Sequence, residues 1–101
     1  MTDKVQDLQQ LLTISRIMLE KAREGAWNEV SALETQRSES IRQFFLVPVQ
    51  QVYADAVAAA IQAIMTIDRD IMALGVLKKV DLAQTLQTLE QGKRAIKAYV
   101  S

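Results

Sequence analysis

The sequence contains no histidine and no cysteine, and it has only one proline and three glycines in 101 residues. Without histidine, the chain cannot be a phosphotransfer domain with a histidine nucleophile or a histidine-ligated metal protein. Without cysteine, it has neither a disulfide framework nor a thiolate metal site. Few glycines and prolines leave room for long, uninterrupted helices, and half of the residues are hydrophobic. We therefore expect a helical protein that holds no cofactor or metal.

An excess of either charge is also missing, because twelve basic and twelve acidic side chains cancel. No overall field then draws the chain to nucleic acid or to a membrane surface. No apolar run approaches the roughly 20 residues that a membrane span needs, and the acidic, amphipathic N-terminus is unlike a signal peptide. We expect a cytoplasmic protein without nucleic-acid binding or membrane insertion. The one local bias lies in residues 78–101, where five basic and two acidic groups leave a net charge of +3.

The sequence does contain apolar residues that recur at spacings of three and four, as on one face of a helix. Breaks at Gly25, Pro48 and Gly75 divide this pattern into helices expected at about 4–24, 27–46, 50–74 and 81–99. At this length the chain suits a single helical domain, 1–101, with one core. The predicted fold is all-α, an antiparallel bundle of three to four helices.

The first turn is marked by Gly25 and Trp27, which we interpret with Arg37 as a structural hinge. Gly25 suits the left-handed position that ends a helix. Complete burial of the Trp27 indole gives an upper bound of about 4–6 kcal/mol, so the side chain is expected to anchor the hairpin. Arg37 follows Glu34 by three residues on the same arc. The pair either satisfies itself at the rim of the bundle, or Arg37 contacts a partner or a loop.

The helix expected at 50–74 carries apolar residues over most of its circumference. It is either the central helix of a bundle or one wall of a groove for another helix, since alanine permits close approach and methionine adapts to irregular partners. The candidate binding stripe consists of Ala54, Ala58, Ile61, Met65 and Met72. By contrast, the helix at 81–99 is expected to be the least stable, because Gly92 costs about 1 kcal/mol in a helix interior.

No catalytic constellation accompanies these helices. The serines have no histidine partner, and no glycine-rich phosphate loop is present. Asp68 and Asp70 are two residues apart on a helix, so their carboxylates point in different directions. We therefore expect no enzyme activity. By elimination, the chain works by binding another protein.

The hairpin region has a more specific pattern, L-x2-S-x2-M-L-x2-A-x2-G-A-W-x2-V-x2-L-E-x2-R, which resembles the FliT family of flagellar export chaperones. It comprises Leu12, Ser15, Met18, Leu19, Ala22, Gly25, Ala26, Trp27, Val30, Leu33, Glu34 and Arg37. The region of Leu74 and the closing Gly92-Lys93-Arg94-x3-Ala98-Tyr99 are similar to that family's third and fourth helices. Ala26 departs from the pattern, since the family usually has a polar residue before the tryptophan, and this puts the cap of the second helix in doubt.

The resemblance implies a small cytoplasmic chaperone that binds the C-terminal, helix-forming segment of the filament-cap protein and delivers it to the type III export apparatus. In that family the last helix can lie over the binding surface and must move. This implies an autoinhibitory or gate-docking role for Lys93, Arg94 and Tyr99. A flagellin-type export chaperone and a regulator that sequesters a flagellar transcription factor remain alternatives. The exposed apolar stripes also suit a homodimer.

Overall fold

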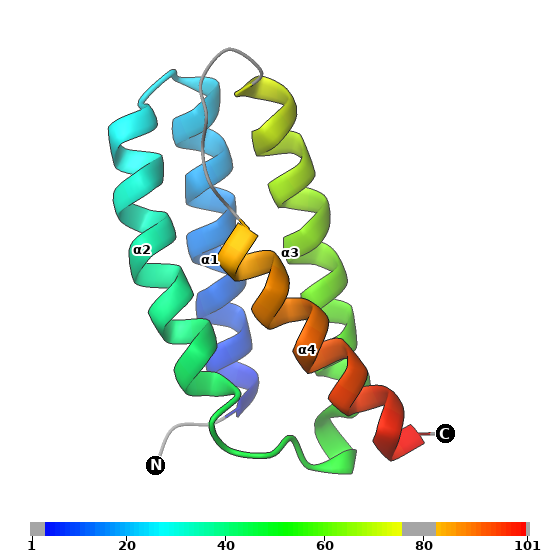
Figure 1. Cartoon of the computed structure of the whole chain (residues 1–101). Coiled ribbons are helices and arrows are strands. Elements are labelled where there is room, and N and C mark those ends of the chain that lie inside the picture. Colours follow the sequence, from blue (N-terminus) through cyan, green and yellow to red (C-terminus); the bar gives the residue numbers. More distant parts are fainter. Residues whose placement is uncertain (1–3, 76–82, 101) are drawn as a thin grey trace.

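The computed structural model describes residues 4–75 and 83–100, which form four α-helices and no strand within these ranges. The helices are α1 (Lys4–Arg23), α2 (Trp27–Phe44), α3 (Ala54–Leu74) and α4 (Ala83–Val100). A 3-10 turn, η1 (Gln51–Tyr53), precedes α3. The predicted all-α antiparallel bundle is confirmed (Figure 1). The expected start of the last helix, at about residue 81, lies outside the described residues.

The helices form a three-helix layer with a fourth helix laid across it (Figure 1). α2 and α3 both pack against α1, while α4 packs against α2 and α3 on the side away from α1. α4 begins at mid-height and runs obliquely towards the end where α2 connects to α3, which we call the lower end. None of the described helices combines the length and the apolarity needed to cross a bilayer.

The turn between α1 and α2 has the geometry expected of a glycine stop. Gly25 has a φ of +73°, in the left-handed region. Its N–H donates to the carbonyl of Ala22 (3.0 Å), and the Ala26 N–H donates to the carbonyl of Lys21 (2.9 Å), which together make a Schellman motif. Ala26 gives α2 no side-chain cap, as its departure from the family pattern indicated.

Trp27 is only half-buried and packs against the cluster at this end of the bundle. The prediction of a large buried anchor was too strong, because an indole that opens a surface helix keeps one face in solvent. Val30, one helical turn further on, is the fully buried residue here. The contribution of Trp27 to stability is therefore well below the 4–6 kcal/mol limit for complete burial.

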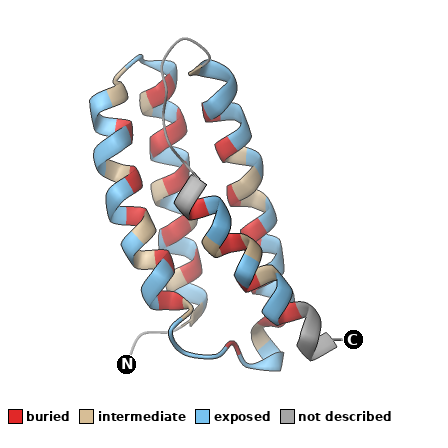
Figure 2. Cartoon of the chain, viewed as in Figure 1, coloured by how far each residue is buried: buried red, intermediate tan, exposed pale blue. Residues whose placement is uncertain are grey.

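The buried residues lie mainly on the inner sides of the helices (Figure 2), and the apolar ones form two clusters. The upper core, near the α1–α2 turn, consists of Met18, Leu19, Ala22, Val30 and Ile71. The lower core consists of Leu8, Leu11, Ile41, Phe44, Val49, Ala54, Val57, Ala60, Ile61, Ile64, Leu89 and Ile96. Each of α1, α2 and α3 supplies residues to both cores, so each helix also crosses the level between them.

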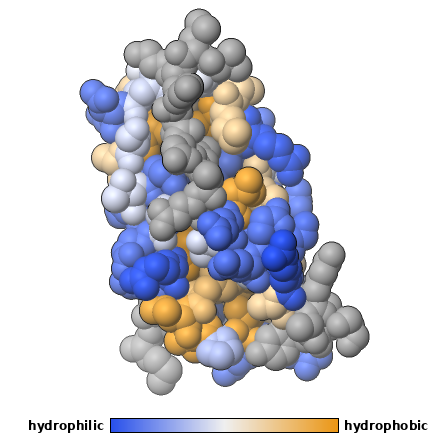
Figure 3. Space-filling model, viewed as in Figure 1, coloured by the Kyte–Doolittle hydropathy of each residue, from blue (hydrophilic) through white to orange (hydrophobic). Residues whose placement is uncertain are grey.

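The connection between α2 and α3 departs from the predicted helix ends. α2 ends at Phe44, two residues earlier than expected, and α3 is preceded by η1. Pro48 explains the early end, because it has no N–H to donate and biases Val47 towards extended backbone. Val49 turns into the lower core, whereas Leu46 is 66% exposed. Figure 3 shows apolar surface gathered at this end of the molecule.

Candidate functional site

The face that α2 and α3 present to α4 is the candidate functional site; we call it the groove, and α4 packs along it (Figure 1). Within the described part of α4, three side chains are buried, those of Thr85, Leu89 and Ile96. Their spacing of four and seven residues places them on one face of the helix. Leu89 and Ile96 enter the lower core, and Thr85 lies at its upper boundary, beside Glu34 and Ser38.

Gly92 lies on this same face, against the ring of Phe45. A Cβ atom at Gly92 would lie 2.5 Å from Cζ and 2.6 Å from Cε1 of that ring, which is closer than real Cβ atoms approach. Phe45 in turn stands edge-on to Phe44, with ring centroids 5.0 Å apart. The sequence suggested only that Gly92 weakens α4. In the structure, its missing side chain also makes room for an aromatic ring of the groove.

A buried polar layer separates the two cores at the level of the upper end of α4. Ser15 of α1, Glu34 and Arg37 of α2, and Asp68 of α3 are all buried here. Each lies between residues of the upper core and residues of the lower core along its own helix. Of the two alternatives for Arg37, the pair with Glu34 is formed, but it does not lie at the rim, since the exposed fraction of Arg37 is 0%.

Arg37 holds the layer together. Its Nη1 donates to Asp68 Oδ1 (2.7 Å) and Ser15 Oγ (3.0 Å), and its Nη2 donates to Asp68 Oδ2 (2.9 Å) and Glu34 Oε2 (2.7 Å). The contact with Asp68 is bidentate, which is the strongest geometry for a guanidinium and a carboxylate. Its Nε is buried without a hydrogen-bond partner among the described residues. One side chain thus connects α1, α2 and α3.

The layer contains two carboxylates and one guanidinium, so it carries one negative charge in excess when all three groups are ionised. Burial raises the pKa of the Asp68 carboxyl above its usual value, and the nearby Glu34 charge acts in the same direction. The bonds from Arg37 oppose this shift and do not cancel it. Additional hydrogen-bond donors to the carboxylates are therefore stabilising here.

α4 supplies one such donor. Thr85 Oγ1 donates to Glu34 Oε1 (2.5 Å) and lies 2.8 Å from Ser38 Oγ, which also donates to Glu34 Oε1 (2.8 Å). This is the polar contact by which α4 joins the layer. The sequence analysis did not single out Thr85 and considered Asp68 only together with Asp70, although both residues lie on apolar faces of their helices.

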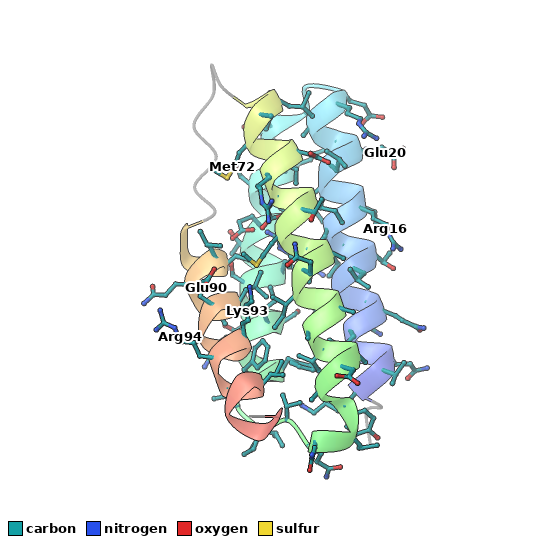
Figure 4. All side chains as sticks on the ribbon, turned by 90° about the vertical axis from the view of Figure 1, so that its right-hand side faces the viewer. Arg16, Glu20, Met72, Glu90, Lys93 and Arg94 are labelled. Carbon is teal, nitrogen blue, oxygen red and sulfur yellow. The ribbon has the colours of Figure 1, made fainter. Side chains whose placement is uncertain are left out.

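The candidate binding stripe of α3 is divided by the structure. Ala54 and Ile61 are buried in the lower core, and Met65 is partly buried against it. Ala58 is exposed, and Met72 is 55% exposed near the upper end of α3. Ile61 and Met65 therefore pack with the cluster that receives Leu89 and Ile96 of α4, whereas Met72 lies beyond it (Figure 4).

Of the three residues expected to act from the last helix, two are described. Lys93 is half-buried, and Arg94 is exposed on the outer side of α4 (Figure 4). The side chain of Tyr99 lies outside the described residues. Within the described ranges, no group of His, Cys, Asp and Glu side chains is placed to hold a metal ion.

A second hollow lies between the start of α1 and the end of α2, with a volume of about 520 Å³. Its wall includes Leu11, Ile14, Phe44 and Val47. Lys4 crosses it, with Nζ donating to the carbonyl of Phe44 (3.0 Å) and lying 4.1 Å from the centroid of the Phe44 ring. The hollow contains no reactive constellation.

A comparison with known protein families gives a match over most of the chain. The sequence profile of the family described as flagellar protein FliT matches residues 5–101. Searches of curated proteins and of solved structures found no match. Because the profile covers nearly the whole chain, this protein belongs to the FliT family of flagellar proteins.

Proposed function

We propose that this protein is a cytoplasmic flagellar export chaperone without catalytic activity. It holds the helix-forming C-terminal segment of the filament-cap protein in the groove between α2 and α3 and delivers it to the type III export apparatus. The observation that supports this most directly is that the groove already accepts a helix, α4, through a small apolar and polar contact. Membership of a flagellar family supports the same function.

α4 is the helix that can leave most easily. α4 makes a smaller contact with α2 and with α3 than α1 does. Because apolar burial is the main favourable term in packing, the detachment of α4 costs less than that of the other helices. Detachment uncovers the surface of Ile61 and Met65, onto which an amphipathic helix of the client can pack.

The exposed residues near the groove extend this proposal. Met72, beyond the start of α4, offers additional apolar surface to a client helix longer than α4. Arg94 on the outer side of α4, with Lys93 and Tyr99, is proposed to dock at the export apparatus once α4 is displaced.

Lysine substitutions on the groove side of α3 test the client site. In the 101-residue chain, Met65→Lys and Met72→Lys should each weaken binding of purified filament-cap protein about tenfold or more, because a charged head group then opposes an apolar helix face. Isothermal titration calorimetry measures the affinity, and circular dichroism checks helicity. The matched control is Thr66→Lys on the exposed face of α3. Unchanged binding by both folded methionine variants would remove the groove as the client site.

The two alternative functions can be told apart from this one by similar binding measurements. A flagellin-type chaperone would bind flagellin in preference to the filament-cap protein. A regulator that sequesters a flagellar transcription factor would need the basic residues of α4 for that factor, and Arg94→Glu would abolish its binding while leaving the filament-cap protein bound.

A further inference from the structure

We propose that the groove binds only helices with a particular pattern of side chains, and that α4 has this pattern. The pattern is a hydroxyl donor, an aliphatic residue four positions later, a residue with little or no side chain seven positions later, and a second aliphatic residue eleven positions later. In α4 these are Thr85, Leu89, Gly92 and Ile96. This inference rests on the proposed function, since it describes the partner of the same groove.

Geometry places the four positions in one line. Steps of four, three and four residues return to almost the same angle of a helix with 3.6 residues per turn. Three of these positions bury a side chain, and Gly92 is buried as well. Leu86 and Arg94, which lie on other faces of α4, are exposed. The pattern therefore contains every buried residue of α4 between positions 85 and 96.

The hydroxyl position follows from the excess negative charge of the polar layer. Glu34 Oε1 accepts hydrogen bonds from Ser38 and from Thr85, and α4 supplies the second of these. A helix with an aliphatic side chain at this position would cover a buried carboxylate without giving it a donor. Loss of a hydrogen bond to a charged group weakens binding about tenfold or more. An acidic side chain would be worse, because the layer already has two carboxylates.

The small position follows from Phe45. The ring occupies the space that a Cβ atom at Gly92 would need, and Phe44 stands edge-on against it. The end of the ring can give way for a single methyl group but not for a branched side chain. Phe45 thus selects helices by size, as the Glu34 carboxylate selects them by hydrogen bonding.

The aliphatic positions follow from the lower core. Leu89 and Ile96 are 2% and 5% exposed and belong to the same cluster as Ile61. Seven residues separate them, so a client helix must present aliphatic side chains two turns apart to fill the same space. The partner is therefore an amphipathic helix with a narrow apolar stripe. The stripe has a hydroxyl donor at one end and, within it, a residue with little or no side chain.

A peptide experiment tests the pattern. The reference peptide has the sequence of residues 83–100, carries a fluorescent label and is added to the 101-residue chain. Binding is measured by fluorescence anisotropy to the wild-type chain and to the Thr85→Val chain. The Thr85→Val chain should bind the reference peptide about tenfold more tightly, since its own α4 has lost the hydroxyl that competes for Glu34.

Peptide variants then separate the requirements. With the Thr85→Val chain, a Thr85→Ser peptide should bind like the reference, whereas Thr85→Val and Gly92→Leu peptides should each lose about tenfold. A Gln87→Val peptide, altered at an exposed position, is the control and should bind like the reference. Equal binding of all five peptides would overturn the donor and size requirements and would leave the groove itself in place.

The failure of the inference can be told apart from that of the proposed function. If the reference peptide fails to bind the Thr85→Val chain while the filament-cap protein binds it, α4 is not a template and the inference is wrong, although the chaperone function stands. If neither the peptide nor the filament-cap protein binds, both the inference and the proposed function are wrong. If the peptide binds and displaces the filament-cap protein, both are supported.

Discussion

Arg37 connects three helices through charged hydrogen bonds in a place that water does not reach, so its loss should be costly. Replacing it by methionine, which has similar length and no charge, leaves Glu34 and Asp68 buried without a counter-charge. We expect Arg37→Met to lower the free energy of unfolding by about 3–5 kcal/mol. Urea unfolding followed by circular dichroism measures this loss.

Arg42→Met is the matched control for that prediction. Arg42 also bonds a glutamate three residues away, Glu39, but both side chains are more than half exposed. We expect a change within about 0.5 kcal/mol for this variant, because exposed ion pairs contribute little. If Arg37→Met cost no more than Arg42→Met, the buried layer would contribute nothing to stability.

The sequence indicated some of these residues and not others. Periodicity alone places Ser15, Glu34 and Arg37 on the same arcs as the apolar residues of their helices. Their partners could not be predicted, because the bond between Arg37 and Asp68 depends on how far α3 is shifted along α2, and periodicity within each helix does not give this shift. A polar residue within the apolar stripe of each helix was the available signal. Asp68 showed this signal, because it lies between Ile64 and Ile71 in the apolar stripe of its helix. It was considered only together with Asp70.

At the scale of elements, the helices and their first turn were predictable because they depend on local rules. A 3.6-residue repeat and a glycine with positive φ need no knowledge of distant residues. The position of α4 does depend on distant residues. Gly92 appeared as a defect in a helix because the ring that fills its space, Phe45, is 47 residues away in the sequence.

The small contact of α4 predicts that it opens before the other helices. Hydrogen–deuterium exchange followed by mass spectrometry should show backbone amides of α4 exchanging at least about tenfold faster than those of α3, a helix of comparable length. Thr85→Val should widen this difference without changing exchange in α1. Equal protection of α3 and α4 would mean that α4 opens only when the whole bundle unfolds, and the groove would then be closed to any client.

For the molecule as a whole, the polar layer divides one core into two and fixes the register of the helices. Apolar cores tolerate sliding of one helix along another, because aliphatic contacts are alike. A bidentate bond between Arg37 and Asp68 exists in only one register, and the Thr85 hydroxyl extends the same constraint to α4. The layer thus gives the four helices a defined arrangement, at the cost of a buried negative charge in excess.

That excess charge makes the pH dependence of stability the last prediction. The pKa of Asp68 is raised on folding from its usual value of 3.8, first by burial and then by Glu34. A raised pKa means that the folded state binds the proton more tightly than the unfolded state does. The stabilisation that this proton binding contributes is therefore fully present below pH 3.8. It is lost as the pH rises through the pKa that Asp68 has in the folded state.

Comparison with Asp68→Asn isolates this contribution, because the variant keeps the shape of the side chain and does not titrate. We expect the stability of the wild type relative to Asp68→Asn to fall as the pH rises from about 3.5 to 7, as measured by urea unfolding at each pH. Exposed groups such as Glu39, whose pKa is lowered by Arg42, affect both proteins equally and cancel in the difference. A difference that instead rises with pH would show that the bonds from Arg37 outweigh the burial of the Asp68 carboxylate.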